Sequence, residues 1–264
     1  MFYIITTLKN FSLSKKLLSN LNSRVILFNV IFYCRSLIMS WKRINIGSLS
    51  RRPLPKTQYA IFLLLSLLML SSCQGPSEIS LFDGRTLGRW KITDFGGQGN
   101  VYVKDGSIFM EMGNDMTGIH WTGPVVRMNY EISLEAKRVT GSDFFCGLTF
   151  PVGDNPCSLI LGGWGGEVCG LSNLDYYDAA NNETTRIVSF ETGRWYRVRL
   201  RVTPNKIEAW LDDEKLVDVV TTGRKIDIRP EVDLSQPLGI ATWQTTGAVR
   251  DIRLQTLTDV SDIL

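Results

Sequence analysis

Residues 195–202 read WYRVRLRV, and after the leading tryptophan apolar and basic side chains alternate without a break. Successive side chains of a β-strand point to opposite faces, so the apolar set that begins at Tyr196 shares one face and the three arginines share the other. The stretch therefore predicts a strand that is buried on one side. A row of arginines can bind an anionic ligand, but more often it forms the solvent-exposed face of a strand.

The same alternation continues on both sides of this strand. The turn Thr203-Pro204-Asn205 leads into residues 206–211, and the turn Asp212-Asp213 leads into residues 215–220. Residues 128–136 alternate in the same way. Shorter segments of this kind predict further strands at residues 101–103, 107–112, 144–150, 158–161, 186–190, 238–243 and 249–257.

This succession of short strands, separated by Gly, Asn, Asp and Pro turns, predicts an all-β fold, either a β-sandwich or a jelly roll. No segment after Gln74 shows a 3.6-residue period over a length that would predict a helix. No linker or internal repeat divides the strands. We therefore expect one domain at residues 79–258, after a short tether at residues 74–78 and before a tail at residues 259–264.

The charge of the chain is divided unevenly. The first 73 of the 264 residues carry ten Lys or Arg and no Asp or Glu, whereas the rest carries 19 basic and 26 acidic residues, so the two parts are +10 and −7. Binding a polyanion requires a net basic footprint. The acidic balance of the folded part argues against nucleic acid as a partner, and the basic excess is assigned to targeting.

The targeting segment has the features of a signal peptide. Arg51, Arg52 and Lys56 precede an apolar run at residues 59–70, which is shorter than the roughly 20 residues that span a bilayer. The run ends in Leu-Ser-Ser-Cys at Cys73, which resembles a bacterial lipobox and predicts lipidation of Cys73 after cleavage just before it. A diacylglyceryl-type anchor would hold the domain at a membrane of the cell envelope.

The position of this segment predicts a later translation start. The apolar stretch at residues 26–33 is too short to span a membrane and is interrupted by Asn29. We expect translation to begin at Met39, which gives a leader of 34 residues before Cys73. Gln74, rather than Asp, follows the cysteine and resembles a signal for sorting to the outer membrane.

Three cysteines follow Cys73, and they are Cys146, Cys157 and Cys169; the chain has a single histidine, His120. In an oxidising compartment two of the three can form a disulfide, or they can act as small buried hydrophobic residues. Their spacing fits no zinc motif. Because P-loop, dinucleotide, G-x-S-x-G and EF-hand patterns are also missing from the sequence, it predicts neither a metal nor a cofactor.

Residues 162–166, Gly-Gly-Trp-Gly-Gly, are the most unusual stretch. Glycines permit close approach of the backbone, and an exposed Trp164 between Gly163 and Gly165 could stack on a sugar ring. The alternative is a glycine-rich bulge with Trp164 packed inward. Polar loops on a rigid sandwich often carry binding groups, and the loop that follows contains Glu167, Asp175, Tyr176, Tyr177, Asp178, Asn181, Asn182 and Glu183.

Several motifs occur in the order and spacing of a known family. The opening residues 80–90 read SLFDGRTLGRW, residues 101–108 read VYVKDGSI, residues 191–198 read ETGRWYRV, and residues 237–240 read PLGI. Together they resemble the bacterial 3-keto-disaccharide hydrolase-like domain family over nearly all of residues 79–257. The resemblance implies a concanavalin A-like jelly roll, often secreted or lipid-anchored, that acts on glycosides oxidised at C3.

The chain departs from this family in two ligand-facing regions. Residues 141–148 read GSDFFCGL, where family members tend to have an Asn-Ser-Gly turn and an Arg that closes the next strand. The glycine loop around Trp164 also replaces the usual mid-domain strand. The resemblance therefore implies the fold more strongly than the activity, and no catalytic residue is carried over from it.

A 3-keto glycoside can be cleaved without a metal or cofactor. The C3 ketone acidifies the C2 proton, a base removes it, donors hold the enolate, the C1 oxygen leaves, and water then adds. The candidate catalytic residues are Glu167, Asp175 and His120. The candidate substrate-binding residues are Trp164, Gly163, Gly165, Tyr176, Tyr177, Asp178, Arg186 and Trp121.

The alternative function is a non-catalytic, lipid-anchored carbohydrate-binding module. It would use Trp164, Tyr176 and Tyr177 as a stacking platform and would need no acid and base. Both hypotheses name a carbohydrate and a membrane as partners, and the sequence leaves the oligomeric state open.

Overall fold

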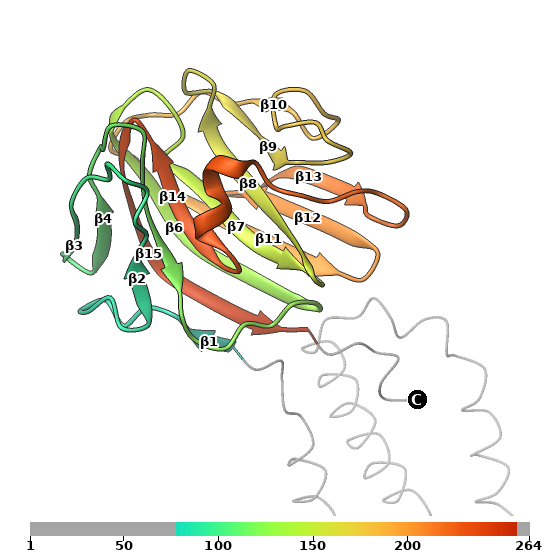
Figure 1. Ribbon diagram of the computed structural model, residues 1–264, viewed down its shortest axis with the longest axis horizontal. Helices are drawn as coiled ribbons and strands as arrows, with labels where there is room; N and C mark the ends of the chain where they lie inside the picture. Colours follow the sequence, from blue (N-terminus) through green and yellow to red (C-terminus); the bar gives the residue numbers. More distant parts are fainter. Residues whose placement is uncertain (1–77, 258–264) are drawn as a thin grey trace, which may run out of the picture. The chain divides into compact units, whose positions relative to one another are not determined.

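The computed structural model describes residues 78–257, which form two antiparallel β-sheets packed on one another (Figure 1). The predicted signal peptide, its lipidation site Cys73 and the predicted start at Met39 lie outside the described residues, as does the C-terminal tail. The architecture of the described part is a concanavalin A-like jelly-roll β-sandwich, and the all-β prediction is confirmed.

The larger sheet has eight strands in the order β13-β12-β11-β6-β15-β4-β3, with β1 also paired to β15. The stretch that opened the sequence analysis forms its strand β11, where Val198 lies opposite Leu134 on one side and Leu211 on the other. The eight strands are β1 (Glu78–Ser80), β3 (Val101–Lys104), β4 (Ser107–Met110), β6 (Tyr130–Gly141), β11 (Tyr196–Thr203), β12 (Lys206–Leu211), β13 (Glu214–Val220) and β15 (Thr245–Thr256).

The smaller sheet has seven strands in the order β10-β9-β8-β7-β14-β5-β2. A short 3₁₀-helix, η3 (Pro230–Ser235), precedes β14 in the chain and packs on β14 and β5. The seven strands are β2 (Trp90–Ile92), β5 (Met116–Trp121), β7 (Cys146–Val152), β8 (Asn155–Gly163), β9 (Val168–Ser172), β10 (Arg186–Ile187) and β14 (Gly239–Trp243).

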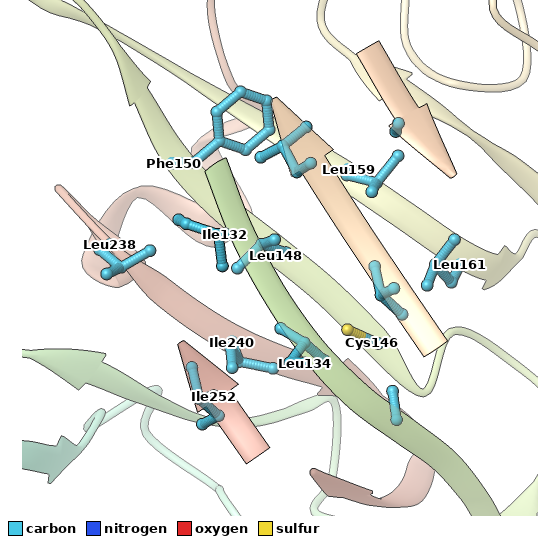
Figure 2. Close-up of a cluster of buried hydrophobic side chains, with 14 of the residues drawn as sticks. Ile132, Leu134, Cys146, Leu148, Phe150, Leu159, Leu161, Leu238, Ile240 and Ile252 are labelled. Atoms are coloured by element: carbon cyan, nitrogen blue, oxygen red, sulfur yellow. The ribbon is translucent and has the colours of Figure 1, made fainter. Parts of the chain in front are cut away.

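The hydrophobic core fills the space between the two sheets and is one continuous cluster. Figure 2 shows part of it, where Ile132 of β6 lies near Leu148 of β7 and Leu134 of β6 lies near Ile240 of β14. The alternation in the sequence is the cause, because every second side chain of these strands points inward. Burial of this apolar surface, at about 25 cal/mol per Å², is the main force that holds the sheets together.

The outward face of β11 carries the arginine row, and the prediction of a solvated charged face is confirmed. Arg201 donates to Glu131 at 2.9 Å and Arg197 to Asp213 at 2.9 Å. The Arg199 guanidinium lies 3.9 Å from the centroid of the Trp210 ring. Each guanidinium thus has a partner within the sheet, which leaves no free row for an anionic ligand.

The structure also decides between the two interpretations of the cysteines. Cys146, Cys157 and Cys169 are free thiols buried in the core. Burial raises the pKa of Cys146 and Cys157 to about 12 and that of Cys169 to about 11. They therefore act as small hydrophobic side chains, and none of the three forms a disulfide with another.

Some strands were not predicted. The short strands β1 and β9 carry too few residues for a period to be recognised, and β9 contains Gly170. The segment predicted as a strand at residues 186–190 pairs only over Arg186–Ile187. The 3₁₀-helix η3 was also missed, because six residues that begin with a proline show no helical period.

Candidate functional site

The outer face of the seven-stranded sheet has a band of small side chains. Gly118 lies opposite Ala241, Ala241 opposite Gly147, and Gly147 opposite Ile160, so these residues follow one another across four strands. Ile160 in turn lies opposite Gly170 on β9. Because glycine and alanine fill little space, the band leaves a trough on the sheet, and larger side chains at its margins become walls.

One wall is the 3₁₀-helix η3, the short orange coil that Figure 1 shows over the sheet containing β7, β8 and β14. Its approach requires a glycine beneath it: a Cβ atom on Gly239 would lie 2.5 Å from the carbonyl oxygen of Ser235. Val232 of η3 packs with Met116 and Ala241 in a small apolar cluster on this face. The helix is thus fixed at the end of the trough.

Between these walls lies a cavity of about 240 Å³. Its floor is formed by strands β5, β8, β9 and β14, and its rim by η3, the segment before β7 and the loop between β8 and β9. The lining residues are Met116, Asp143, Phe144, Ser158, Ile160, Trp164, Ser172, Arg229, Glu231, Val232 and Trp243.

The segment that runs from the last two residues of β8 to the start of β9, residues 162–167, is called the Trp164 loop below. Trp164 itself has a φ of +49° and is 43% exposed, with its side chain on the cavity. Gly165 donates its N–H to the Asp143 carboxylate at 3.2 Å, and Gly166 donates to the Gly163 carbonyl at 3.1 Å. The interpretation of an exposed indole is therefore confirmed over that of an inward-packed one.

The charged part of the cavity is held by Arg229. Its guanidinium donates to Glu231 at 2.7 Å and to Asp178 at 3.2 Å. The hydrogen bond from Arg229 lowers the pKa of Glu231, so the carboxylate stays ionised in mildly acidic solution. Asp178 lies behind Arg229 rather than on the cavity wall, and it orients the guanidinium instead of touching a ligand.

The lining combines two kinds of surface. Phe144, Trp164 and Trp243 are aromatic, and aromatic rings offer flat apolar faces on which a sugar ring can stack. Two carboxylates, those of Asp143 and Glu231, accept hydrogen bonds, and one guanidinium donates them. Flat apolar faces with a few convergent polar groups are typical of small-ligand sites, and this combination suits a carbohydrate.

The three predicted catalytic residues lie outside this cavity. Glu167 is exposed and accepts a hydrogen bond from Ser189 at 3.1 Å. The Lys225 backbone N–H and the Arg224 guanidinium both donate to Asp175 and lower its pKa, and Asp175 does not line the cavity. The Nδ1 atom of His120 lies 3.0 Å from the Thr93 hydroxyl, on the same sheet face as Gly239 but beyond the cavity lining.

The structure also separates the predicted binding residues. Trp121 is 9% exposed, packs against Trp90 in the core and donates to the Pro124 carbonyl at 3.1 Å, so it has no free face for a sugar. Tyr176 and Tyr177 are exposed, but neither lines the cavity. Arg186 donates to the backbone carbonyls of its own loop.

Five charged or aromatic residues of the cavity were not singled out from the sequence. Phe144 and Asp143 fall in a region that was identified only as ligand-facing, at residues 141–148. Trp243 ends a strand in which large inward residues alternate with Gly239 and Ala241, and that pattern of small outward residues was the available signal. Arg229 and Glu231 flank Pro230 without any period, so only packing places them.

The described residues contain neither a membrane-spanning helix nor a cluster of metal-binding side chains. Among residues 78–257, no helix is long and apolar enough to cross a membrane. Within the same range, no group of three or more His, Cys, Asp or Glu side chains is arranged to hold a metal ion. The acidic loop shows why: Arg224 bridges Asp175 and Glu183 at 2.6 and 2.7 Å, so these carboxylates are already paired.

The fold and the cavity together define a jelly-roll protein with a ligand-sized site on the outer face of one sheet. The profile of the 3-keto-alpha-glucoside-1,2-lyase-like domain family matches residues 77–255, and the chain belongs to this family. Comparison with curated proteins finds no match.

Three solved structures are similar to this chain at low sequence identity. The Crh5 transglycosylase in complex with NAG is 9% identical, with a TM-score of 0.50 over 70% of this chain and 88% of that chain. The carbohydrate binding module CBM66 from Bacillus subtilis is 10% identical, with a TM-score of 0.45 over 64% and 96%. A β-1,3-1,4-glucanase (lichenase) from a mouse hindgut metagenome is also 10% identical, with a TM-score of 0.46 over 69% and 100%.

Proposed function

We propose that this domain binds a glycoside in the cavity and cleaves glycosides that carry a ketone at C3. The observation that carries the proposal is the lining itself, in which three aromatic rings share one cavity with the Arg229–Glu231 pair and the Asp143 carboxylate. Membership of the 3-keto-alpha-glucoside-1,2-lyase-like family supports the choice of substrate.

The reaction needs two steps. In the first, a carboxylate takes the proton from C2, the electron pair forms the C1–C2 double bond, and the C1–O bond breaks. The carboxyl group returns this proton to the leaving oxygen, so that the aglycone departs as an alcohol and the carboxylate is regenerated. In the second, water adds across this double bond, with its hydroxyl at C1 and its hydrogen at C2. The net result is hydrolysis, and the C3 ketone lowers the barrier because it delocalises the charge that develops when C2 loses its proton.

Each charged residue of the cavity has a role in this scheme. Arg229, which the Asp178 carboxylate orients, donates to the C3 oxygen as it becomes an enolate. Glu231 is ionised at neutral pH and uses one oxygen, Oε1, to bind Arg229, so we assign it the C2 proton. Asp143, whose two oxygens accept the N–H groups of Phe144 and Gly165, binds sugar hydroxyls.

The test is turnover of a 3-keto-disaccharide by the domain and its variants. We expect Glu231→Gln to lower kcat by about 10²–10⁴, the usual range for losing a general base. Glu183→Gln is the matched control, because Glu183 makes the same kind of arginine pair at 2.7 Å but lies outside the cavity. Full activity of Glu231→Gln would contradict the assignment.

The assignment from the sequence gives the opposite expectation and is tested in the same assay. If Glu167→Gln, Asp175→Asn or His120→Ala abolished turnover while Glu231→Gln kept it, the catalytic group would lie outside the cavity. If no variant and no wild-type protein turned over the 3-keto-disaccharide, but unmodified glycan bound saturably, the domain would be a carbohydrate-binding module.

We also propose that Cys73 carries a lipid anchor that tethers the domain to the cell envelope. The basic segment, the apolar run at residues 59–70 and the Leu-Ser-Ser-Cys tetrapeptide support this proposal. Cell fractionation is the test: the wild-type protein should sediment with membranes and label with radioactive palmitate, and Cys73→Ala should do neither. Equal labelling of Cys73→Ala would contradict it.

A further inference from the structure

We propose that Arg138 is a positioning residue for the cavity: it fixes the Trp164 loop so that the indole remains on the cavity wall. This inference rests on the proposed function, in which Trp164 stacks on the sugar. Arg138 belongs to β6 of the opposite sheet and is not a lining residue of the cavity, but its side chain donates to the backbone carbonyl of the lining residue Asp143.

The sequence position of Arg138 is anomalous for a charged residue. The inward side chains of β6 run from Tyr130 through Ala136 at every second residue, and the next inward position is Arg138. Arg138 is only 6% exposed to solvent. A charge at a core-facing position is costly unless its donors are satisfied, so the groups that Arg138 contacts explain its presence.

Those groups are the carbonyls of two cavity segments. The Nη2 atom of Arg138 donates to Gly166 O at 2.7 Å, Gly162 O at 3.3 Å and Asp143 O at 3.3 Å. The first two carbonyls lie at the two ends of the Trp164 loop, and the third lies in the segment before β7. One guanidinium thus ties both segments to the eight-stranded sheet.

The surroundings of the guanidinium are otherwise apolar. It lies 5.2 Å from the centroid of the Phe145 ring and 5.7 Å from that of Phe190, and its Nε is buried without a hydrogen-bond partner. Burial lowers the pKa of Arg138, and no carboxylate in the described residues forms a salt bridge with it. An aliphatic side chain could fill this space at a lower desolvation cost, so stability alone does not account for an arginine here.

The position of the Arg138 guanidinium also explains the glycines of the Trp164 loop. A Cβ atom on Gly162 would lie 2.5 Å from Arg138 Nη2, and one on Gly166 would lie 2.9 Å from the Ser142 carbonyl. Gly166 moreover has a φ of +111°, which side chains rarely adopt. Both glycines are therefore required for the loop to close on the guanidinium.

Arg138→Lys is the variant that tests the proposal, because lysine keeps the charge but its side chain ends one bond short of the Nη2 atom that donates to all three carbonyls. Arg250→Lys is the matched control. Arg250 also stacks on an aromatic ring, 4.2 Å from Trp195, but it pairs with Glu135 and contacts no cavity segment. If Arg138→Lys does not fold, as judged by its Tm, the same measurements are made on Arg138→Gln, which we expect to fold.

The first readout needs no ligand. We expect amide hydrogen exchange in residues 162–167 to be at least tenfold faster in Arg138→Lys than in wild type, and unchanged in Arg250→Lys. This follows because a hydrogen bond to a charged donor contributes roughly a tenfold factor or more to the opening equilibrium. Exchange at the wild-type rate in Arg138→Lys would overturn the proposal.

The second readout is a double-mutant cycle with Trp164→Ala, measured as the Kd for the 3-keto-disaccharide with Glu231→Gln present throughout so that the sugar is not cleaved. Arg138→Lys should weaken binding about tenfold in the wild-type background and less than twofold in the Trp164→Ala background. An equal loss in both backgrounds would overturn the proposal, because Arg138 would then act without Trp164. If wild-type protein does not bind the sugar, the proposed function fails, and the exchange rates still decide the role of Arg138.

Discussion

Replacement of Trp164 by alanine is the most direct test of the cavity as a sugar site. Trp164 is 43% exposed. A tryptophan side chain has about 250 Å² to bury, so about 100 Å² of it faces the cavity and solvent. A sugar ring that covers half of this area, about 50 Å², would gain about 1.3 kcal/mol at 25 cal/mol per Å². Trp164→Ala should therefore raise Kd about tenfold.

The assay is isothermal titration of the 3-keto-disaccharide into the purified domain in the Glu231→Gln background, so that the sugar binds without being cleaved. Tyr102→Ala is the matched control, because Tyr102 is 38% exposed and lies on β3 of the other sheet. It should leave Kd unchanged. The reasoning is refuted if Trp164→Ala binds within twofold of wild type. If Tyr177→Ala raises Kd instead, the sugar stacks on the loop that carries Asp175 and Glu183 and not in the cavity.

Two further predictions concern pH. Arg229 lowers the pKa of Glu231, so the Glu231 carboxylate is ionised at and above the ordinary glutamate pKa of about 4.3. The contribution of the ionised pair to ligand binding should therefore be lost only as pH falls through the lowered pKa of Glu231. In a titration of Kd against pH, Glu231→Gln should abolish this loss of affinity at low pH. If the loss is unchanged in Glu231→Gln, another group causes it. In alkali, the buried thiols of Cys146, Cys157 and Cys169 have raised pKa values, so their contribution to stability is complete below the unfolded-state pKa of about 8.5 and is lost as pH rises. Between pH 7 and about 9.5 each thiol should cost about 1.4 kcal/mol in the free energy of unfolding measured with urea under reducing conditions. Cys157→Ala should reduce this pH difference by about a third, and an undiminished difference would mean that the thiols are not its source.

The strands of the eight-stranded sheet were predictable because their pattern is local. In β6, β11 and β12 every second residue is apolar, and burial of one face is sufficient to select that alternation. The seven-stranded sheet was harder to read. Residues 146–152 of β7 are buried throughout, because one face meets the core and the other is covered, so the polar half of the alternation is missing.

The candidate site was predictable only in part. The glycines around Trp164 revealed an unusual loop, because positive φ angles require glycine at several of its positions. The carboxylates could not be ranked in the same way. Asp175 and Glu231 are both acidic residues near an arginine, and only their distance from the cavity separates them.

By itself, the sequence determined the all-β class, the two faces of the long strands, the exposed arginine row and the resemblance to a family. These properties depend on neighbours within a few residues, which a linear pattern records. The tertiary structure decided which side chains share the cavity, since Met116, Asp143, Trp164, Arg229 and Trp243 come together only through strand register and the packing of η3. It also decided that Arg138, a charge at an inward position of β6, meets the backbone of a loop from the other sheet. No local pattern encodes such meetings, because they depend on contacts between residues that are far apart in the chain.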